Sequence, residues 1–176
     1  MVVGCAGLHF TEIGSFLEYF ERVRDRTRKA IAAVPPDRMD WTYKPGKFTT
    51  ADIARHLAAI ERWMYAENVR GQPSRYAGHG AEIATGHPDL STFFEALHRE
   101  AMEIFATLSP EDLQRKCLTP AGTPIATWKW LRSMVEHEIH HRGQIYVYLS
   151  LMGLEGPPLY GLTSEEVRAR SVPGSS

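Results

Sequence analysis

Four long stretches of this sequence repeat their apolar residues at the spacing of an α-helix, and this periodicity constrains the fold more than any other feature. They cover residues 8–34, about 50–64, 90–108 and 128–152. Residues three or four positions apart share one face of a helix, so each stretch presents an apolar face to a partner. No segment of similar length alternates as a long strand would. The sequence therefore predicts an all-α protein built as a four-helix bundle.

Residues that start and stop helices define the ends of these stretches. Pro35-Pro36 ends the first helix, and Thr49-Thr-Ala-Asp52 is a variant of the capping box that opens the second. Thr127 is expected to cap the fourth helix, which begins at Trp128 and ends before Gly153.

Shorter elements are expected between and after the long helices. Ser109 followed by Pro110 has the pattern of a helix start, which predicts a short helix there. Residues 116–126 predict a small hairpin around the turn Pro120-Ala-Gly122, and the tail contains a short helix at Ser164. Residues 71–89 form the longest irregular segment, which either covers a pocket or connects two helices.

Bulk properties indicate one ordinary globular domain over residues 1–176. The 20 basic and 21 acidic residues give a formal net charge of −1, so we expect neither a nucleic-acid nor a membrane partner. Cys5 and Cys117 are far apart and form no disulfide framework, which suits a reducing cytoplasm. The longest apolar run, from Ile145 to Leu154, is too short to span a bilayer.

The first helix carries a group of basic residues that could suggest a nucleic-acid surface. Their spacing spreads them around the helix, and Glu18 and Asp25 lie four residues before Arg22 and Lys29. We therefore interpret the group as a solvated face. Its members are Arg22, Arg24, Arg26, Arg28 and Lys29.

The fourth helix contains the feature that is hardest to explain by structure alone. His137 and His141 are four residues apart and can bind one ion together. Their face of the helix is otherwise apolar, so both imidazoles are expected to point into the protein, where their ring nitrogens need partners. His140 points about 100° away from His141, and we interpret it as a residue of the polar face or a support for the ligands. The residues that share the face are Trp130, Met134, Gln144, Ile145 and Tyr148.

A three-histidine site needs a third ligand from another helix. His56 is centred on the apolar face of the second helix, although a lone histidine there is more often a core residue with a satisfied hydrogen bond. His98 lies beside the core face of the third helix. Spacing alone favours His56 over His98 only modestly. The remaining candidates are His9 at the N-terminus and His79 and His87 in the long loop.

The string His137-Glu-Ile-His-His141 also matches the HExxH pattern of zinc peptidases. The metzincin extension is absent, because Gln144 and Val147 occupy its positions. Glu138 has a simpler interpretation as the i,i+4 ion-pair partner of Arg142. A zincin-like metallopeptidase using His137, Glu138 and His141 therefore remains a minor alternative.

Two segments together resemble the DinB family, also called DinB/YfiT-like metal-binding proteins. They are Phe48-Thr-Thr-Ala-Asp-Ile-Ala-Arg-His56 and Glu136-His-Glu-Ile-His-His-Arg-Gly-Gln144, followed by Pro157-Pro-Leu-Tyr-Gly161. The resemblance covers nearly the whole chain and implies a four-helix bundle. It also implies that a divalent metal, most often zinc or nickel, is held by three histidines, which correspond here to His56, His137 and His141.

In that family, the assigned activities include thiol-dependent transfer and metal-dependent hydrolysis, and many members are homodimers. The resemblance therefore implies a cytoplasmic thiol transferase or hydrolase acting on a small molecule, with a low-molecular-weight thiol as a cosubstrate. Three neutral imidazoles would leave an open coordination position, which is the catalytic pattern. The sequence identifies no proton acceptor, since Glu138 and Tyr148 qualify only if the fold turns them toward the metal. A metal-binding stress-response module without turnover is the alternative from a different class.

Overall fold

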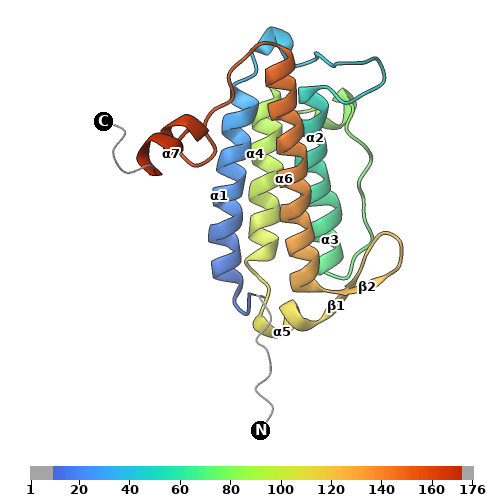
Figure 1. Cartoon of the computed structure of the whole chain (residues 1–176). Coiled ribbons are helices and arrows are strands. Elements are labelled where there is room, and N and C mark those ends of the chain that lie inside the picture. The colour runs from blue at the N-terminus through green and yellow to red at the C-terminus, as the bar shows by residue number, and fades with distance from the viewer. Residues whose placement is uncertain (1–9, 172–176) are drawn as a thin grey trace.

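The long helices pack side by side along most of their length in the computed structural model, which describes residues 10–171 (Figure 1). Helices α1 and α6 run in one direction, and α2 and α4 run in the other. The chain between α3 and α4 returns along the outside of the bundle, beside α2 and α3. The long elements are α1 (Ile13–Ala32), α2 (Thr50–Ile60), α3 (Ala66–Val69), α4 (Leu90–Phe105) and α6 (Thr127–Leu151).

Short elements fill the connections, as the sequence predicts. The hairpin strands pair antiparallel with Cys117 opposite Ile125, and a π-helical turn, Glu61–Tyr65, joins α2 to α3. The others are two 3₁₀ turns (Pro36–Arg38 and Ala81–Ala84), α5 (Pro110–Gln114), β1 (Lys116–Leu118), β2 (Pro124–Ala126) and α7 (Ser164–Ser171). The predicted all-α four-helix bundle, with its short helices and hairpin, is confirmed.

Capping boxes open two of the helices, α2 and α5. Thr49 and Asp52 form the predicted capping box, in which the Thr49 hydroxyl accepts from the Asp52 N–H at 3.0 Å. Ser109 caps α5 in the same way. The prediction for α6 is wrong, because Thr127 is its first residue and not its cap. The Thr127 hydroxyl donates instead to the Arg115 carbonyl at 2.9 Å, which ties α6 to the end of α5.

The core consists of two apolar clusters, one in each half of the bundle. The first includes Phe16 and Phe105, and the second includes Leu57 and Phe93. On every long helix a buried polar or charged residue lies between the part that enters one cluster and the part that enters the other. These residues are Arg24 and Thr27 on α1, Glu61 after α2, His98 on α4 and Glu138 on α6.

These residues form one connected buried polar layer. Arg24 pairs with Glu61 and, at 3.0 Å, with Glu138. Thr27 donates to Glu138 at 2.7 Å, and His98 Nδ1 lies 2.8 Å from the Glu61 carboxylate. Burial opposes the charged form of His98, but its carboxylate neighbours outweigh that effect and raise its pKa above the ordinary value. Charge-assisted contacts in this layer link the four helical segments of the bundle.

The position of Arg24 corrects the interpretation of the basic residues on the first helix. Arg24 is fully buried, and its guanidinium lies 4.4 Å from the centre of the Phe94 ring. Arg22 does lie on the solvated face and pairs with Glu18 at 3.4 Å. Asp25 pairs with Arg28 and not with Lys29 as predicted. In the part of the chain that the structure describes, no helix is both long and apolar enough to cross a membrane.

Replacing Arg24 by Met is expected to lower the free energy of unfolding by about 3–5 kcal/mol, because Glu61 and Glu138 would lose their buried cation. Urea unfolding followed by circular dichroism measures this change. The matched control is Arg22→Met on the same helix, which breaks only an exposed ion pair and should cost about 0.5 kcal/mol or less. Equal losses in the two variants would contradict a structural role for the buried layer.

Candidate metal centre

Three imidazoles from two helices meet in the interior beside the buried polar layer. His56 projects from α2, and His137 and His141 project from successive turns of α6. The Nε2 atom of His137 lies 3.1 Å from that of His56 and 3.1 Å from that of His141. Nitrogen ligands of a tetrahedral Zn²⁺ lie about 3.3 Å apart, since each bond is about 2.0–2.1 Å long. The cluster therefore has the dimensions of a three-ligand metal site.

The outer ring nitrogens of two of these histidines have hydrogen-bond partners. His141 Nδ1 lies 2.8 Å from Gln144 Oε1, which can only accept, so the Nδ1 atom of His141 carries the proton. Its Nε2 lone pair then points toward His137. His56 Nδ1 lies 2.6 Å from the Tyr76 hydroxyl, whose oxygen can accept a hydrogen bond from an Nδ1–H group. Hydrogen bonds of this kind orient metal-binding histidines and select their tautomer.

The two contacts between ring nitrogens in the cluster cannot both be hydrogen bonds. The Gln144 contact leaves His141 Nε2 without a proton, so this atom needs a donor from His137. If His137 Nε2 donates to His141, it cannot also donate to His56. If it accepts from His56, its lone pair faces that of His141. Whichever tautomer His56 adopts, only one of the two 3.1 Å contacts can be a hydrogen bond, whereas a cation between the nitrogens could accept a lone pair from each of them.

Burial keeps the imidazoles in the form that binds metals. Burial, followed by the neighbouring histidines, lowers the pKa of His56 to about 3 and that of His137 to about 4. Burial also lowers the pKa of His141, although its contact with Gln144 opposes the shift. All three side chains are therefore neutral near pH 7, with lone pairs available to a cation.

The Phe48 ring covers the cluster from the loop before α2. Its centre lies 5.6 Å from that of His56 and 6.4 Å from that of His141, to which it is nearly parallel. The His79 ring packs on Phe48 at 3.9 Å. The Tyr148 hydroxyl donates to the Phe48 carbonyl at 2.8 Å, so α6 fixes the backbone beside this ring. The ring limits the access of water to His56 and His141 on this side.

The long loop is anchored to the second helix near the same site. Arg55 Nε donates to the His79 carbonyl at 2.8 Å, and Arg55 also pairs with Asp52 of the capping box at 2.7 Å. The loop also contributes Tyr76, the partner of His56. The segment 71–89 therefore lies against the candidate site and is more than a connection between helices.

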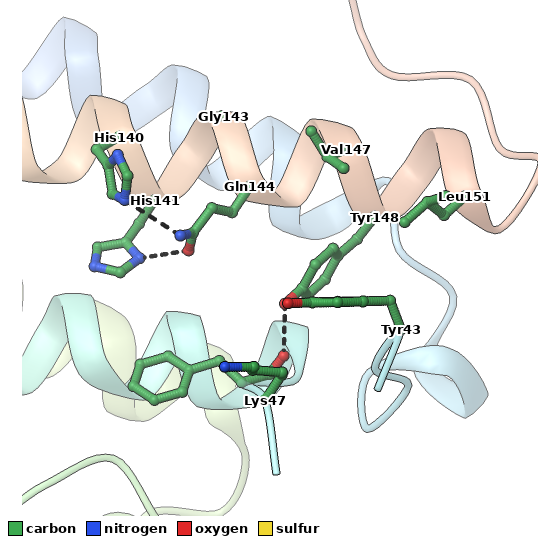
Figure 2. A pocket seen from close by; sticks show the side chains of 10 residues that line it. Tyr43, Lys47, His140, His141, Gly143, Gln144, Val147, Tyr148 and Leu151 are labelled. Carbon is green, nitrogen blue, oxygen red and sulfur yellow. Dashed lines mark hydrogen bonds between the residues drawn. The ribbon is translucent and has the colours of Figure 1, made fainter. Parts of the chain in front are cut away.

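A cavity of about 790 Å³ opens beside His141. Figure 2 shows it between two walls, one formed by α6 and the other by the loop that carries Tyr43 and Lys47. Gln144 and Tyr148 line the α6 wall. A small molecule in this space would contact one of the three histidines directly.

Glu138, one residue from His137, faces away from the cluster and into the buried polar layer. The predicted pair between Glu138 and Arg142 is wrong, since Arg142 donates instead to the Val23 carbonyl at 3.1 Å. The peptidase alternative needs a glutamate beside the metal, and Glu138 is held by Arg24 and Thr27 instead. Burial raises the pKa of Glu138 despite the nearby Arg24.

The other histidines have separate environments. His98 is bonded on both ring nitrogens, to Glu61 and Glu21, so it is not available as the third ligand. His140 is exposed and contacts the Gln144 amide at 3.2 Å. His87 packs on Phe93, and His9 lies outside the described residues.

Sequence reasoning missed the residues that support the cluster. Tyr76 lies in an irregular segment without periodicity, so no pattern placed it beside His56. No pattern in the sequence placed the Phe48 ring beside His56 either. The contact between Gln144 and His141 had a detectable signal, because the two residues are three positions apart on one helix.

The fold and the site define a four-helix bundle with a partly buried three-histidine cluster that could hold a divalent metal ion. The model of the DinB superfamily matches residues 19–145, which is more than half of the chain. The chain belongs to the DinB superfamily.

Individual relatives agree with this assignment. The uncharacterized protein YjoA of Bacillus subtilis is 26% identical over 149 residues, covering 82% of this chain and 93% of that protein. The crystal structure of YjoA aligns with a TM-score of 0.67 at 20% identity, covering 82% of this chain and 96% of the other. A DinB-like protein from Bacillus cereus aligns with a TM-score of 0.65 at 18% identity, covering 81% and 94%. These structural matches support the fold.

Replacing His56, His137 or His141 by Ala is expected to weaken zinc binding by more than about 100-fold, because each removes one ligand atom. Competition with a fluorescent chelator measures the affinity. His87→Ala is the control, since it removes an imidazole that packs on Phe93, apart from the cluster. Wild-type affinity in His56→Ala would show that the third ligand has been assigned wrongly.

Replacing Tyr76 by Phe is expected to weaken zinc binding by about 10- to 100-fold, because His56 Nδ1 would lose the oxygen that orients its ring. The same competition assay measures the loss. Tyr43→Phe serves as the control, because the Tyr43 side chain is exposed and forms no contact with His56. An unchanged affinity in Tyr76→Phe would mean that this hydrogen bond does not support metal binding.

Proposed function

We propose that this protein is a metal-dependent enzyme of the DinB superfamily that transfers a thiol to a small molecule or hydrolyses one. The observation that carries the proposal is the convergence of three imidazole nitrogens within 4.8 Å of one another, where one of the three histidines, His141, also lines a cavity large enough for a small substrate. Three protein ligands leave a position for a substrate or water, whereas closed structural sites use four. The proposed metal is zinc or nickel, the proposed thiol is of low molecular weight, and the proposed location is the cytoplasm.

The chain's own residues hold and shield the reacting groups. His56, His137 and His141 would bind the cation, with Tyr76 and Gln144 orienting two of their rings. A divalent cation bound there supplies Lewis-acid activation of a water molecule or a thiol near neutral pH. The Phe48 ring packs against His56 and His141 and also forms part of the wall of the adjacent cavity, which leaves room for the substrate.

Two features favour chemistry on small molecules over peptide cleavage. Glu138 is bound within the buried polar layer, so the HExxH string lacks its general base. In the described residues, the two-stranded hairpin is the only sheet. It directly precedes the N-terminal end of α6, whereas the cavity lies along the C-terminal half of that helix. A peptide substrate would therefore lack a strand edge beside the histidines.

The proposal predicts turnover that depends on the metal. Protein stripped with a chelator should lose activity on a panel of thiol-acceptor and ester substrates, and adding back one equivalent of zinc or nickel should restore it. His137→Ala, which removes a ligand, should remain inactive after metal is added.

Glu138→Gln should retain activity if it folds, because Glu138 does not face the cluster. Metal binding without turnover across the panel would indicate a non-catalytic metal-binding module. Casein cleavage that is lost in Glu138→Gln would indicate a peptidase. Either result would overturn the proposed activity.

A further inference from the structure

We infer that the cavity beside His141 is the binding site for an organic anion with an apolar body, which identifies the substrate class of the proposed enzyme. The claim that the ligand is a substrate rests on the proposed function. The claim that the cavity binds an anion rests on separate observations. These are the composition of the cavity walls, a glycine in the middle of α6, and an unpaired lysine.

The cavity walls are mainly apolar side chains and the faces of aromatic rings. Val147 and Leu151 contribute from α6, and Tyr43 and Phe48 contribute from the loop. Val147 is 57% exposed, and Leu151 is 59% exposed. A ligand that covers them would remove apolar surface from water, which favours binding. These walls suit an apolar or aromatic ligand body.

Gly143 creates part of this space. It lies in the interior of α6, where glycine destabilises a helix relative to alanine. A Cβ atom at Gly143 would meet nothing within 4 Å, so packing within the chain does not require a glycine. Gly143 also lines the cavity. The missing side chain leaves room for a ligand at a position where the fold alone would accept a larger residue.

Lys47 gives the cavity its charge. It lies on the wall opposite α6, as Figure 2 shows. Among residues 10–171, no carboxylate pairs with Lys47, and none lines the cavity. An ammonium group at the edge of an apolar cavity favours a ligand that carries a carboxylate or a similar anion. The apolar body would extend past Gly143 toward Leu151.

A matched pair of fluorescent probes tests the inference. Dansylglycine carries an apolar ring system and a carboxylate, and dansylglycinamide has the same body without the charge. Fluorescence titrations would use metal-free and zinc-loaded protein, with zinc content measured separately. Wild-type protein should bind the anion about fivefold more tightly than the amide, which is near the limit for an exposed ion pair.

Substitutions assign this preference to the cavity. Lys47→Met should remove the preference for the anion and leave the affinity for the amide unchanged, whereas Lys47→Arg should retain the preference. Gly143→Leu should weaken both probes by about tenfold or more, because its side chain fills the space. Lys47 is exposed in a loop, so its variants remain informative if Gly143→Leu does not fold.

Three results would overturn the inference. The first is equal affinity of wild-type protein for the two probes. The second is an anion preference that survives Lys47→Met and appears only with zinc, because the anion would then bind at the histidines. The third is a dimer in light scattering that Gly143→Leu converts to a monomer, because the cavity would then be an interface between two copies. Failure to bind zinc would contradict the proposed function and leave the result for metal-free protein intact.

Discussion

The buried contact of Arg24 with Glu61 and Glu138 is the constraint on which the arrangement of the helices depends. A charge in a protein interior is tolerated only beside its partners, so the helices must be aligned where these side chains meet. Sliding α6 by one turn would separate Glu138 from Arg24 and leave the Glu138 carboxylate buried without its cationic partner. We infer that this layer specifies the register of the bundle. Apolar contacts above and below the layer stabilise the fold but discriminate less sharply between registers.

The same register determines the geometry of the histidine cluster. His137 is the neighbour of Glu138, and the two side chains leave α6 about 100° apart. Fixing Glu138 against α1 therefore turns His137 toward α2, where His56 lies. The ionic layer and the candidate metal centre use adjacent faces of one helix and share its alignment. This relation explains how a charged residue with no contact to the three histidines can still position them.

The sequence predicted the parts of this structure that depend on local spacing. Helical periodicity gave the bundle, the capping pattern located Thr49, and the i,i+4 relation paired His137 with His141. The choice of His56 over His98 needed the resemblance to a family, because both lie near the core face of their helices. Arg24 and Glu138 were misplaced, since ion pairs between helices leave no periodic signal. Arg24 was grouped with the solvated basic residues of its helix, and Glu138 had a plausible partner, Arg142, nearby in sequence. Tyr76 lies on a loop whose path depends on tertiary contacts.

Helix α6 satisfies three demands at once, and this explains why its sequence departs from a simple amphipathic pattern. One face carries Glu138 toward the ionic layer, a second carries His137 and His141 toward α2, and a third leaves Gly143 and Val147 facing the cavity. The first two faces are constrained by burial. The third exposes an apolar residue and weakens the helix with glycine, neither of which favours folding. An exposed apolar residue and a helix-weakening glycine beside a candidate metal centre are expected where a ligand binds, because the ligand covers the exposed apolar surface.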